Sequence, residues 1–288
     1  MIDPIFLLEA AINGILLGGI LALLALGLNL IFGVIDIVWI VYVDLVMLCM
    51  YVLYFTNQVY GWPFWLAALA ALAVGAGLGV AVHVLVISPI LASPPINQLL
   101  ATGGLLFFIQ SFATFLWTTD HRSVRFSLPS FEVGGIFLPA TRLIPFGISI
   151  LAMLALYLFL TRTFMGTAMR AVAQDREAMA LMGADPRRVY VMTSAVGGLM
   201  AGLAGTLLVF QYSVHPFFGG QFGPLTFMIC VLGGLGNMVG AFVASFIMSE
   251  IISIAGVIWS TEMGYVIAFV VFIVMMFIRP GGILARSE

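Results

Sequence analysis

Residues 170–190 read RAVAQDREAMALMGADPRRVY and hold seven charged side chains in a chain that otherwise avoids charge. The complete sequence has 288 residues, of which 10 are basic and 12 acidic, and 63% are hydrophobic. A soluble domain of this composition would expose large apolar patches to water. The contrast between this segment and its surroundings predicts a polytopic membrane protein in which residues 170–190 form a polar loop.

Apolar runs on both sides of this loop are long enough to cross a bilayer, which takes about 20 residues of helix. Their pattern, read against glycine, proline and polar breakers, predicts an all-α fold with about eight transmembrane segments in a single domain over residues 1–288. The predicted segments are 5–32, 35–55, 62–87, 97–117, 141–161, 189–212, 222–256 and 264–278.

The seventh run is too long for one ordinary helix. Its sequence CVLGGLGNMVGA, residues 230–241, is broken at Gly233, Gly234 and Gly236. Such breaks occur at membrane depth only where protein or a water-filled cavity satisfies the freed backbone. We therefore expect this region to be interrupted, either as two short spans or as a re-entrant pair.

The arginines predict the orientation. Arg279 and Arg286 follow the last run, and half of the ten arginines lie between the fifth and sixth runs: Arg162, Arg170, Arg176, Arg187 and Arg188. By the positive-inside rule both regions are cytoplasmic, which places the N-terminus outside. The seventh run must then cross twice. Residues 124–140 would lie outside, where their alternating pattern predicts a short periplasmic β-hairpin.

Small residues recur four positions apart along several runs. The pairs are Gly14 and Gly18, Gly75 and Gly79, Gly198 and Gly202, and Gly236 and Gly240. This spacing lets helix backbones approach closely in a membrane, so it predicts a compact bundle.

Several kinds of chemistry have no basis in this sequence. It contains no lysine and so cannot form a Walker A phosphate loop; any ATP must be bound by another subunit. Cys49 and Cys230 stand alone in apolar runs, and the histidines share no ligand spacing, so we expect no metal site and no cofactor in this chain. No arrangement of catalytic residues or basic patch indicates an intramembrane enzyme or a nucleic-acid partner.

The charged segment has the pattern of a short amphipathic helix. Apolar residues alternate with the charges, Gly183 ends the run, and Asp185 followed by Pro186 is a typical helix start. The segment therefore predicts a helix at the cytoplasmic surface and then the beginning of the next span. The residues alone equally allow a solvated connector stabilised by surface ion pairs.

Residues 170–207, RAVAQDREAMALMGADPRRVYVMTSAVGGLMAGLAGTL, closely resemble the cytoplasmic loop and following helix of the high-affinity branched-chain amino acid permeases. These permeases are membrane subunits of bacterial ABC importers. The resemblance covers nearly the whole chain. It extends to GLNLIFGV (27–34), DLVML (44–48), HPFFG (215–219), VLGGLGNMVGA (231–241) and FIRPGGIL (277–284).

The resemblance implies a coupling helix at Ala173 to Gly183, within a coupling loop of about 162–188, that docks on a cytoplasmic ATPase. The residues implied in coupling are Arg170, Asp175, Arg176, Glu177, Met179, Leu181 and Gly183. The implied partners are a second, related permease, two ATPase subunits that bind ATP and Mg²⁺, a periplasmic solute-binding protein and the lipid of the bacterial inner membrane. The implied solute is a branched-chain amino acid or a related small amide or carboxylate.

Two interrupted regions, 31–46 and 223–237, are candidates for a translocation path. The acids Asp36, Asp44 and Glu250 lie within or near spans, where ionisable groups are often functional, although they could equally sit at helix ends or pair with a neighbouring helix. The candidate path residues are Asp36, Trp39, Tyr42, Asp44, Gly233, Gly234, Gly236, Asn237 and Glu250.

The first region departs from the family pattern. Typical members have Asn-Phe-Ala-His-Gly before an acid, whereas residues 39–43 here are Trp, Ile, Val, Tyr and Val, followed by Asp44. Three consequences compete: a narrower or more apolar path, a helix that is no longer interrupted, or polar groups supplied by the partner permease. An ion-coupled secondary transporter of a small organic solute, using the intramembrane acids, is the alternative function.

Overall fold

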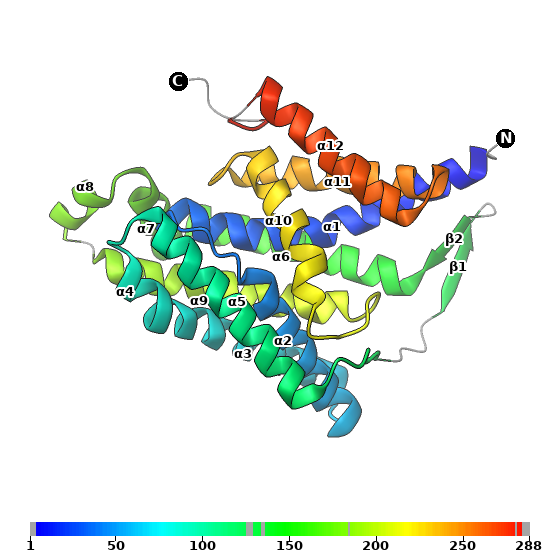
Figure 1. The fold of residues 1–288 in the computed structure, drawn as a ribbon, viewed down its shortest axis with the longest axis horizontal. Helices are drawn as coiled ribbons and strands as arrows, with labels where there is room; N and C mark the ends of the chain where they lie inside the picture. Colours follow the sequence, from blue (N-terminus) through cyan, green and yellow to red (C-terminus); the bar gives the residue numbers. More distant parts are fainter. Residues whose placement is uncertain (1–3, 125–128, 134–135, 184, 280, 284–288) are drawn as a thin grey trace. The chain divides into compact units, whose positions relative to one another are not determined.

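The computed structural model describes residues 4–124, 129–133, 136–183, 185–279 and 281–283. Figure 1 shows that nearly all of them are helical. They divide into two compact units. Unit 1 comprises residues 1–29, 125–152 and 225–288, and unit 2 comprises residues 30–124 and 153–224. Whether the chain forms one permease domain stays a prediction.

Nine helices of the described residues lie wholly in unit 2. They are α2 (Tyr42–Tyr54), the π-helix η1 (Phe55–Val59), α3 (Phe64–Val82), the π-helix η2 (His83–Ile87), α4 (Ser88–Ile90), α5 (Pro95–Trp117), α7 (Phe164–Gln174), α8 (Arg176–Leu181) and α9 (Pro186–Leu208). Within this unit α3 packs along α9, and α2 packs on both.

Unit 1 contains α11 (Met238–Ile258) and α12 (Thr261–Ile278), which pack on each other, and a two-stranded antiparallel sheet. Three helices belong partly to each unit: α1 (Pro4–Ile35), α6 (Ala140–Arg162) and α10 (Phe218–Gly233). The sheet pairs β1 (Ser130–Val133) with β2 (Ile136–Pro139), so the predicted hairpin is confirmed.

The all-α membrane fold is also confirmed. Eight helices of the described residues are long and apolar enough to cross a bilayer, and α10 is a shorter apolar helix. The predicted seventh run is interrupted as expected, because α10 ends at Gly233 and α11 begins at Met238. Only one of its two helices is short, since α11 has 21 residues.

The predicted glycine pairs of α3 and α9 pack against each other. A Cβ atom on Gly75 would lie 3.0 Å from the Cα of Gly202, and one on Gly202 would lie 2.7 Å from the carbonyl oxygen of Ala71. These neighbours are backbone atoms and cannot move aside as a side chain could. Only glycine therefore allows the two helices to approach this closely.

In unit 1 the glycines of α1 face side chains of α11. A Cβ on Gly14 would lie 2.8 Å from the Cδ of Glu250, and one on Gly18 would lie 2.7 Å from the Oγ of Ser249. Gly240, at the start of α11, instead meets the backbone of Gly233. The predicted small-residue positions thus mark contacts between elements in both units.

Candidate functional site

The predicted coupling segment is divided by Asp175. Helix α7 ends at Gln174 and α8 begins at Arg176, so Ala173 to Gly183 is not one helix. Asp175 has an extended backbone, and its carboxylate accepts hydrogen bonds from the backbone N–H groups of Glu177 and Ala178, both at 2.9 Å. An aspartate that caps a helix in this way stops the preceding helix and starts a new one.

The end of α8 and the start of α9 agree with the prediction. Gly183 has a φ of +85°, a conformation that favours glycine and ends the helical run. The Asp185 carboxylate accepts a hydrogen bond from the backbone N–H of Arg187 at 3.0 Å, and α9 begins at Pro186.

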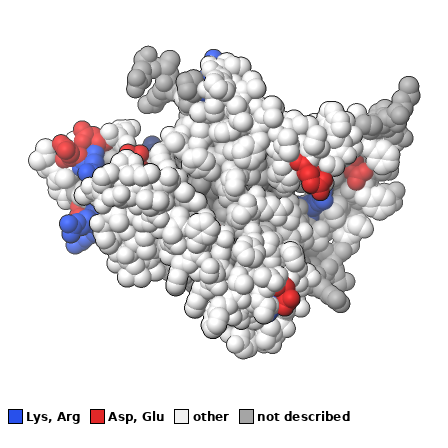
Figure 2. Space-filling view, viewed as in Figure 1, with Lys and Arg blue, Asp and Glu red and all other residues white. Residues whose placement is uncertain are grey.

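Helix α8 exposes both charge and apolar surface. Its charged side chains are exposed, and Leu181 and Met182 at its end are 90% and 84% exposed. Figure 2 shows acidic and basic atoms gathered over the end that carries α8. Within the described part of the chain one ion pair forms, Arg188 with Asp185 at 3.5 Å, so ion pairing does not occupy the charges of α8. This surface suits a protein partner better than a self-stabilised connector.

The predicted coupling loop, residues 162–188, packs on neighbouring helices. On α7, Met169 and Val172 are buried, and Gly166 meets the backbone of α6. The neighbouring Tyr190 of α9 raises the pKa of the Arg176 guanidinium of α8 above its ordinary value, so the two side chains lie close together. Tyr190 is buried, and its ring centroid lies 6.2 Å from that of His83 in η2. Displacement of α8 would therefore reach α9 and its neighbour directly.

The first predicted path region remains interrupted, so one of the three competing consequences, a helix that is no longer interrupted, is wrong. Helix α1 ends at Ile35 and α2 begins at Tyr42. Asp36 has a φ of +61°, a left-handed conformation that aspartate adopts more readily than most residues. Asp36 itself is exposed, whereas Ile37 and Val41 are buried. Bulky buried residues thus fill this interruption.

Trp39 and Tyr42 are packed into unit 2. Both are at most 1% exposed. The Tyr42 hydroxyl donates a long hydrogen bond, 3.4 Å, to the carbonyl oxygen of Gly197, while the indole N–H of Trp39 has no partner among the described residues. These side chains fill space rather than line an open channel.

Asp44 is the most unusual polar group of the candidate path. It is 1% exposed, and its Oδ1 accepts a hydrogen bond from the Nε2 of Gln110 at 2.9 Å. Its Oδ2 is buried and has no partner within the described residues. The backbone of Gly219 lies against the same carboxylate, since a Cβ there would be 2.7 Å from the Asp44 Cγ. A buried carboxyl group with one unsatisfied oxygen can bind a proton, a cation or a donor group.

The break in the second path region, at residues 233–237, lies in unit 1 and forms a tight turn. Gly234 and Gly236 have φ values of +98° and +81°. The side chain of Asn29 on α1 donates to the carbonyl oxygen of Asn237 at 2.9 Å and accepts from the N–H of Gly236 at 2.7 Å. Asn237 then caps α11 by accepting from the N–H of Gly240 at 3.0 Å. Hydrogen bonds from side chains therefore satisfy backbone groups at the break.

Glu250 also lies in unit 1, beside Gly14 of α1. Its carboxyl group is partly buried, and its Oε1 has no hydrogen-bond partner in the described part of the chain. The candidate path residues thus divide between the units: Asp36, Trp39, Tyr42 and Asp44 lie in unit 2, and Gly233, Gly234, Gly236, Asn237 and Glu250 lie in unit 1.

Sequence reasoning missed the residues that support these groups. Gln110, Tyr190 and Asn29 look ordinary in sequence, and only the fold brings them to Asp44, Arg176 and the glycine turn. It also missed a pair of histidines in connecting segments of unit 2. The ring centroids of His121 and His215 lie 4.5 Å apart. The pKa of His215 is lowered, mainly because the ring is partly buried and to a smaller extent because of the charge of His121. The described residues contain no cluster of three or more His, Cys, Asp or Glu side chains.

Comparison with known proteins gives a match over almost the whole chain. Residues 10–276 match the family model described as the branched-chain amino acid transport system / permease component. The chain is 28% identical over 303 residues to the high-affinity branched-chain amino acid transport system permease protein LivH of Escherichia coli K12, covering 99% of this chain and 97% of that protein.

Two further relatives have the same kind of description. The permease protein BraD of Pseudomonas aeruginosa is 25% identical over 296 residues, which cover 98% of this chain and 96% of BraD. A probable branched-chain amino acid transport permease of Methanocaldococcus jannaschii is 28% identical over 141 residues, or 46% of this chain and 45% of that protein. No solved structure matches the chain.

Proposed function

The chain belongs to the family of the branched-chain amino acid transport system permease components, and from this premise we propose that it forms the translocation path of an ATP-driven importer. The proposed solute is a branched-chain amino acid or a related small amide or carboxylate. The chain is a multi-pass membrane protein, and its family is non-catalytic. ATP and Mg²⁺ are therefore assigned to partner subunits, which agrees with the absence of lysine and hence of a Walker A loop.

The surface of α8 is the observation that carries the proposal. A short, capped helix with exposed charges and two exposed apolar side chains is what a docking element on a soluble ATPase needs. Its anchoring through Arg176 and Tyr190 suits the transmission of displacement, because a loose loop would absorb the movement. The proposed coupling residues are Arg170, Asp175, Arg176, Glu177, Met179, Leu181 and Gly183.

The proposed assembly adds to this docking surface the partners that the family implies. ATPases bind α8 on the cytoplasmic side, a periplasmic solute-binding protein delivers the solute, and a second, related permease completes the path in the inner membrane. The N-terminus lies outside and the C-terminus inside, and α10 and α11 each cross the bilayer. Lipid surrounds the helices, and no nucleic acid takes part.

In the proposed path, Asp44 is the group that meets the polar part of the solute. Its unsatisfied Oδ2 can accept a hydrogen bond from an ammonium or amide group, while Gln110 holds its other oxygen. Trp39 and Tyr42 restrict the adjacent space. The other proposed path residues, Gly233, Gly234, Gly236, Asn237 and Glu250, lie in unit 1.

The first experiment tests coupling. The charge reversals Arg176→Glu and Glu177→Arg should prevent the ATPase from co-purifying or uncouple ATP hydrolysis from uptake, while the membrane helices stay folded. Arg142→Glu, a reversal outside the loop, should have neither effect. If both loop variants import solute like the parent, the coupling assignment is wrong.

The second experiment tests the path. The double variant Trp39→Asn with Tyr42→His restores the polar residue types of the family and should change solute preference in a reconstituted transporter. Unchanged preference would remove this segment from the path. The buried, unsatisfied carboxyl groups of Asp44 and Glu250 favour ion-coupled transport as the second candidate. Uptake by the purified chain alone under an ion gradient would support that candidate and contradict ATP-driven import.

A further inference from the structure

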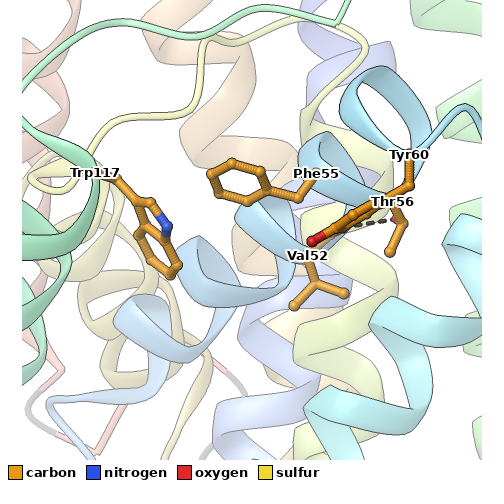
Figure 3. A pocket seen from close by; sticks show the side chains of 5 residues that line it. All are labelled: Val52, Phe55, Thr56, Tyr60 and Trp117. Atoms are coloured by element: carbon orange, nitrogen blue, oxygen red, sulfur yellow. Dashed lines mark hydrogen bonds between the residues drawn. The ribbon is translucent and has the colours of Figure 1, made fainter.

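A pocket in unit 2 lies where two candidate spans end. Val52, Phe55, Thr56, Tyr60 and Trp117 line it, and its volume is about 390 Å³ (Figure 3). The apolar span that comprises α2 and η1 ends at Val59, and the span of α5 ends at Trp117. The pocket therefore lies at a boundary between the hydrocarbon and the polar part of the bilayer.

The lining of this pocket is suited to hydrocarbon. Thr56 is the one residue of the lining with a short polar side chain. Its hydroxyl already donates a hydrogen bond to the carbonyl oxygen of Val52 at 2.7 Å. The indole of Trp117 is fixed by stacking on Tyr51, with ring centroids 4.2 Å apart. Aromatic and aliphatic carbon thus forms most of a preformed space at the membrane surface.

Arg122 lies at the edge of this aromatic group. Its guanidinium carbon is 5.4 Å from the ring centroid of Phe55 and 5.7 Å from that of Tyr54, and its Nη2 donates to the carbonyl oxygen of Trp117 at 2.9 Å. Backbone hydrogen bonds with Val214, of 2.9 and 2.7 Å, fix the residue in place. A guanidinium has five N–H donors, so this geometry leaves donors for an anion.

No carboxylate neutralises this cation among the described residues. Asp120, on the same segment, accepts a hydrogen bond from the Thr118 hydroxyl at 2.6 Å. Tyr60 of the pocket lining and the nearby Trp62 and Trp65 are 72%, 47% and 61% exposed, as aromatic side chains are in the interfacial belts of membrane proteins. The Arg122 guanidinium and the apolar pocket therefore lie next to each other at an interfacial position.

We infer that this pocket binds a phospholipid, with an acyl chain against Phe55 and Trp117 and the phosphate on Arg122. A free amino acid fits less well, because the five lining residues include no carboxylate to accept its ammonium group. The bound lipid would fix the ends of α2 and α5 relative to each other. This assignment does not depend on the transported solute or on the ATPase.

The test compares two lipids that differ in the phosphoglycerol head group. The full-length protein, delipidated in detergent, is titrated with dioleoylphosphatidylglycerol or with dioleoylglycerol, and bound lipid is counted by native mass spectrometry. The first molecule of phosphatidylglycerol that binds should have a dissociation constant at least about tenfold lower than that of dioleoylglycerol, because one charge-assisted contact contributes about this factor. Arg122→Gln should abolish this difference, and Arg142→Gln, the matched loss of an arginine, should preserve it.

A second variant covers the case in which Arg122→Gln does not fold. Val52→Trp fills the pocket and should weaken the binding of both lipids while Arg122 stays in place. Equal binding of the two lipids by the parent, unchanged phosphatidylglycerol binding in Arg122→Gln, or an equal loss in Arg142→Gln would each overturn the inference. Displacement of the lipid by millimolar leucine would instead identify the pocket as a solute site.

Discussion

Each of the two interrupted regions of the chain contains a break between helices, and different interactions hold the two breaks in place. In unit 1 the turn at residues 234–237 is made by Gly234 and Gly236, which have positive φ angles. The Asn29 side chain forms hydrogen bonds with the backbone of Gly236 and Asn237. Residues 36–41 in unit 2 turn on Asp36 and are held by buried bulky side chains, Trp39 above all. A break in a membrane helix can therefore be supported by hydrogen bonds or by packing, and the two supports respond differently to substitution.

The largest effect should come from removing the packing support. Trp39→Ala deletes a fully buried indole and should lower the free energy of unfolding by about 4 kcal/mol, because the cavity can close only in part. Thermal unfolding in detergent, followed by circular dichroism, measures this change. The exposed Trp65→Ala serves as the control. A loss below about 1 kcal/mol would mean that packing does not hold the first break.

A somewhat smaller effect is expected where the glycine turn meets α11. A Cβ at Gly240 would collide with the backbone of Gly233, so Gly240→Ala should cost about 3 kcal/mol. Gly220→Ala is the matched control, since nothing lies within 4 Å of a Cβ there. The same thermal unfolding assay applies, and similar melting temperatures for the two variants would contradict this contact.

The polar support should be weaker than the packing support. Asn29→Leu keeps the side-chain volume but removes the hydrogen bonds to Gly236 and Asn237, which should cost about 2 kcal/mol. Hydrogen–deuterium exchange should show faster exchange at the Gly236 amide, with little change in residues 36–41. Asn97→Leu, at an exposed site, is the control. Equal exchange in the parent and in Asn29→Leu would refute the proposed support.

The smallest effect concerns the backbone of the first break. Asp36→Val places a β-branched residue at a φ of +61° and should cost about 1 kcal/mol, whereas Asp36→Asn should leave stability unchanged. Uptake by Asp36→Asn then separates two roles. Normal uptake would limit Asp36 to a backbone role, and lost uptake with unchanged stability would place its charge in the path.

The comparison also explains what the sequence could predict. Gly233, Gly234 and Gly236 mark their break because glycine is a local signal, and the start of α9 at Asp185 and Pro186 is equally local. The supporting residues act over long distances: Asn29 and Asn237 are 208 positions apart, and Gln110 and Asp44 are 66 apart. Such contacts have no local pattern. Residues 39–43 were ambiguous because bulky apolar side chains fit both a continuous helix and a packed interruption.

The contact between α3 and α9 limits how this protein can change over time. Gly75, Gly79, Gly198 and Gly202 are opposed by main chain rather than by side chains. A second substitution elsewhere can shorten an opposing side chain but cannot shorten a peptide group. No second substitution can therefore compensate for the replacement of any of these four glycines. The contact between α3 and α9 should tolerate less sequence variation than the apolar residues that surround it.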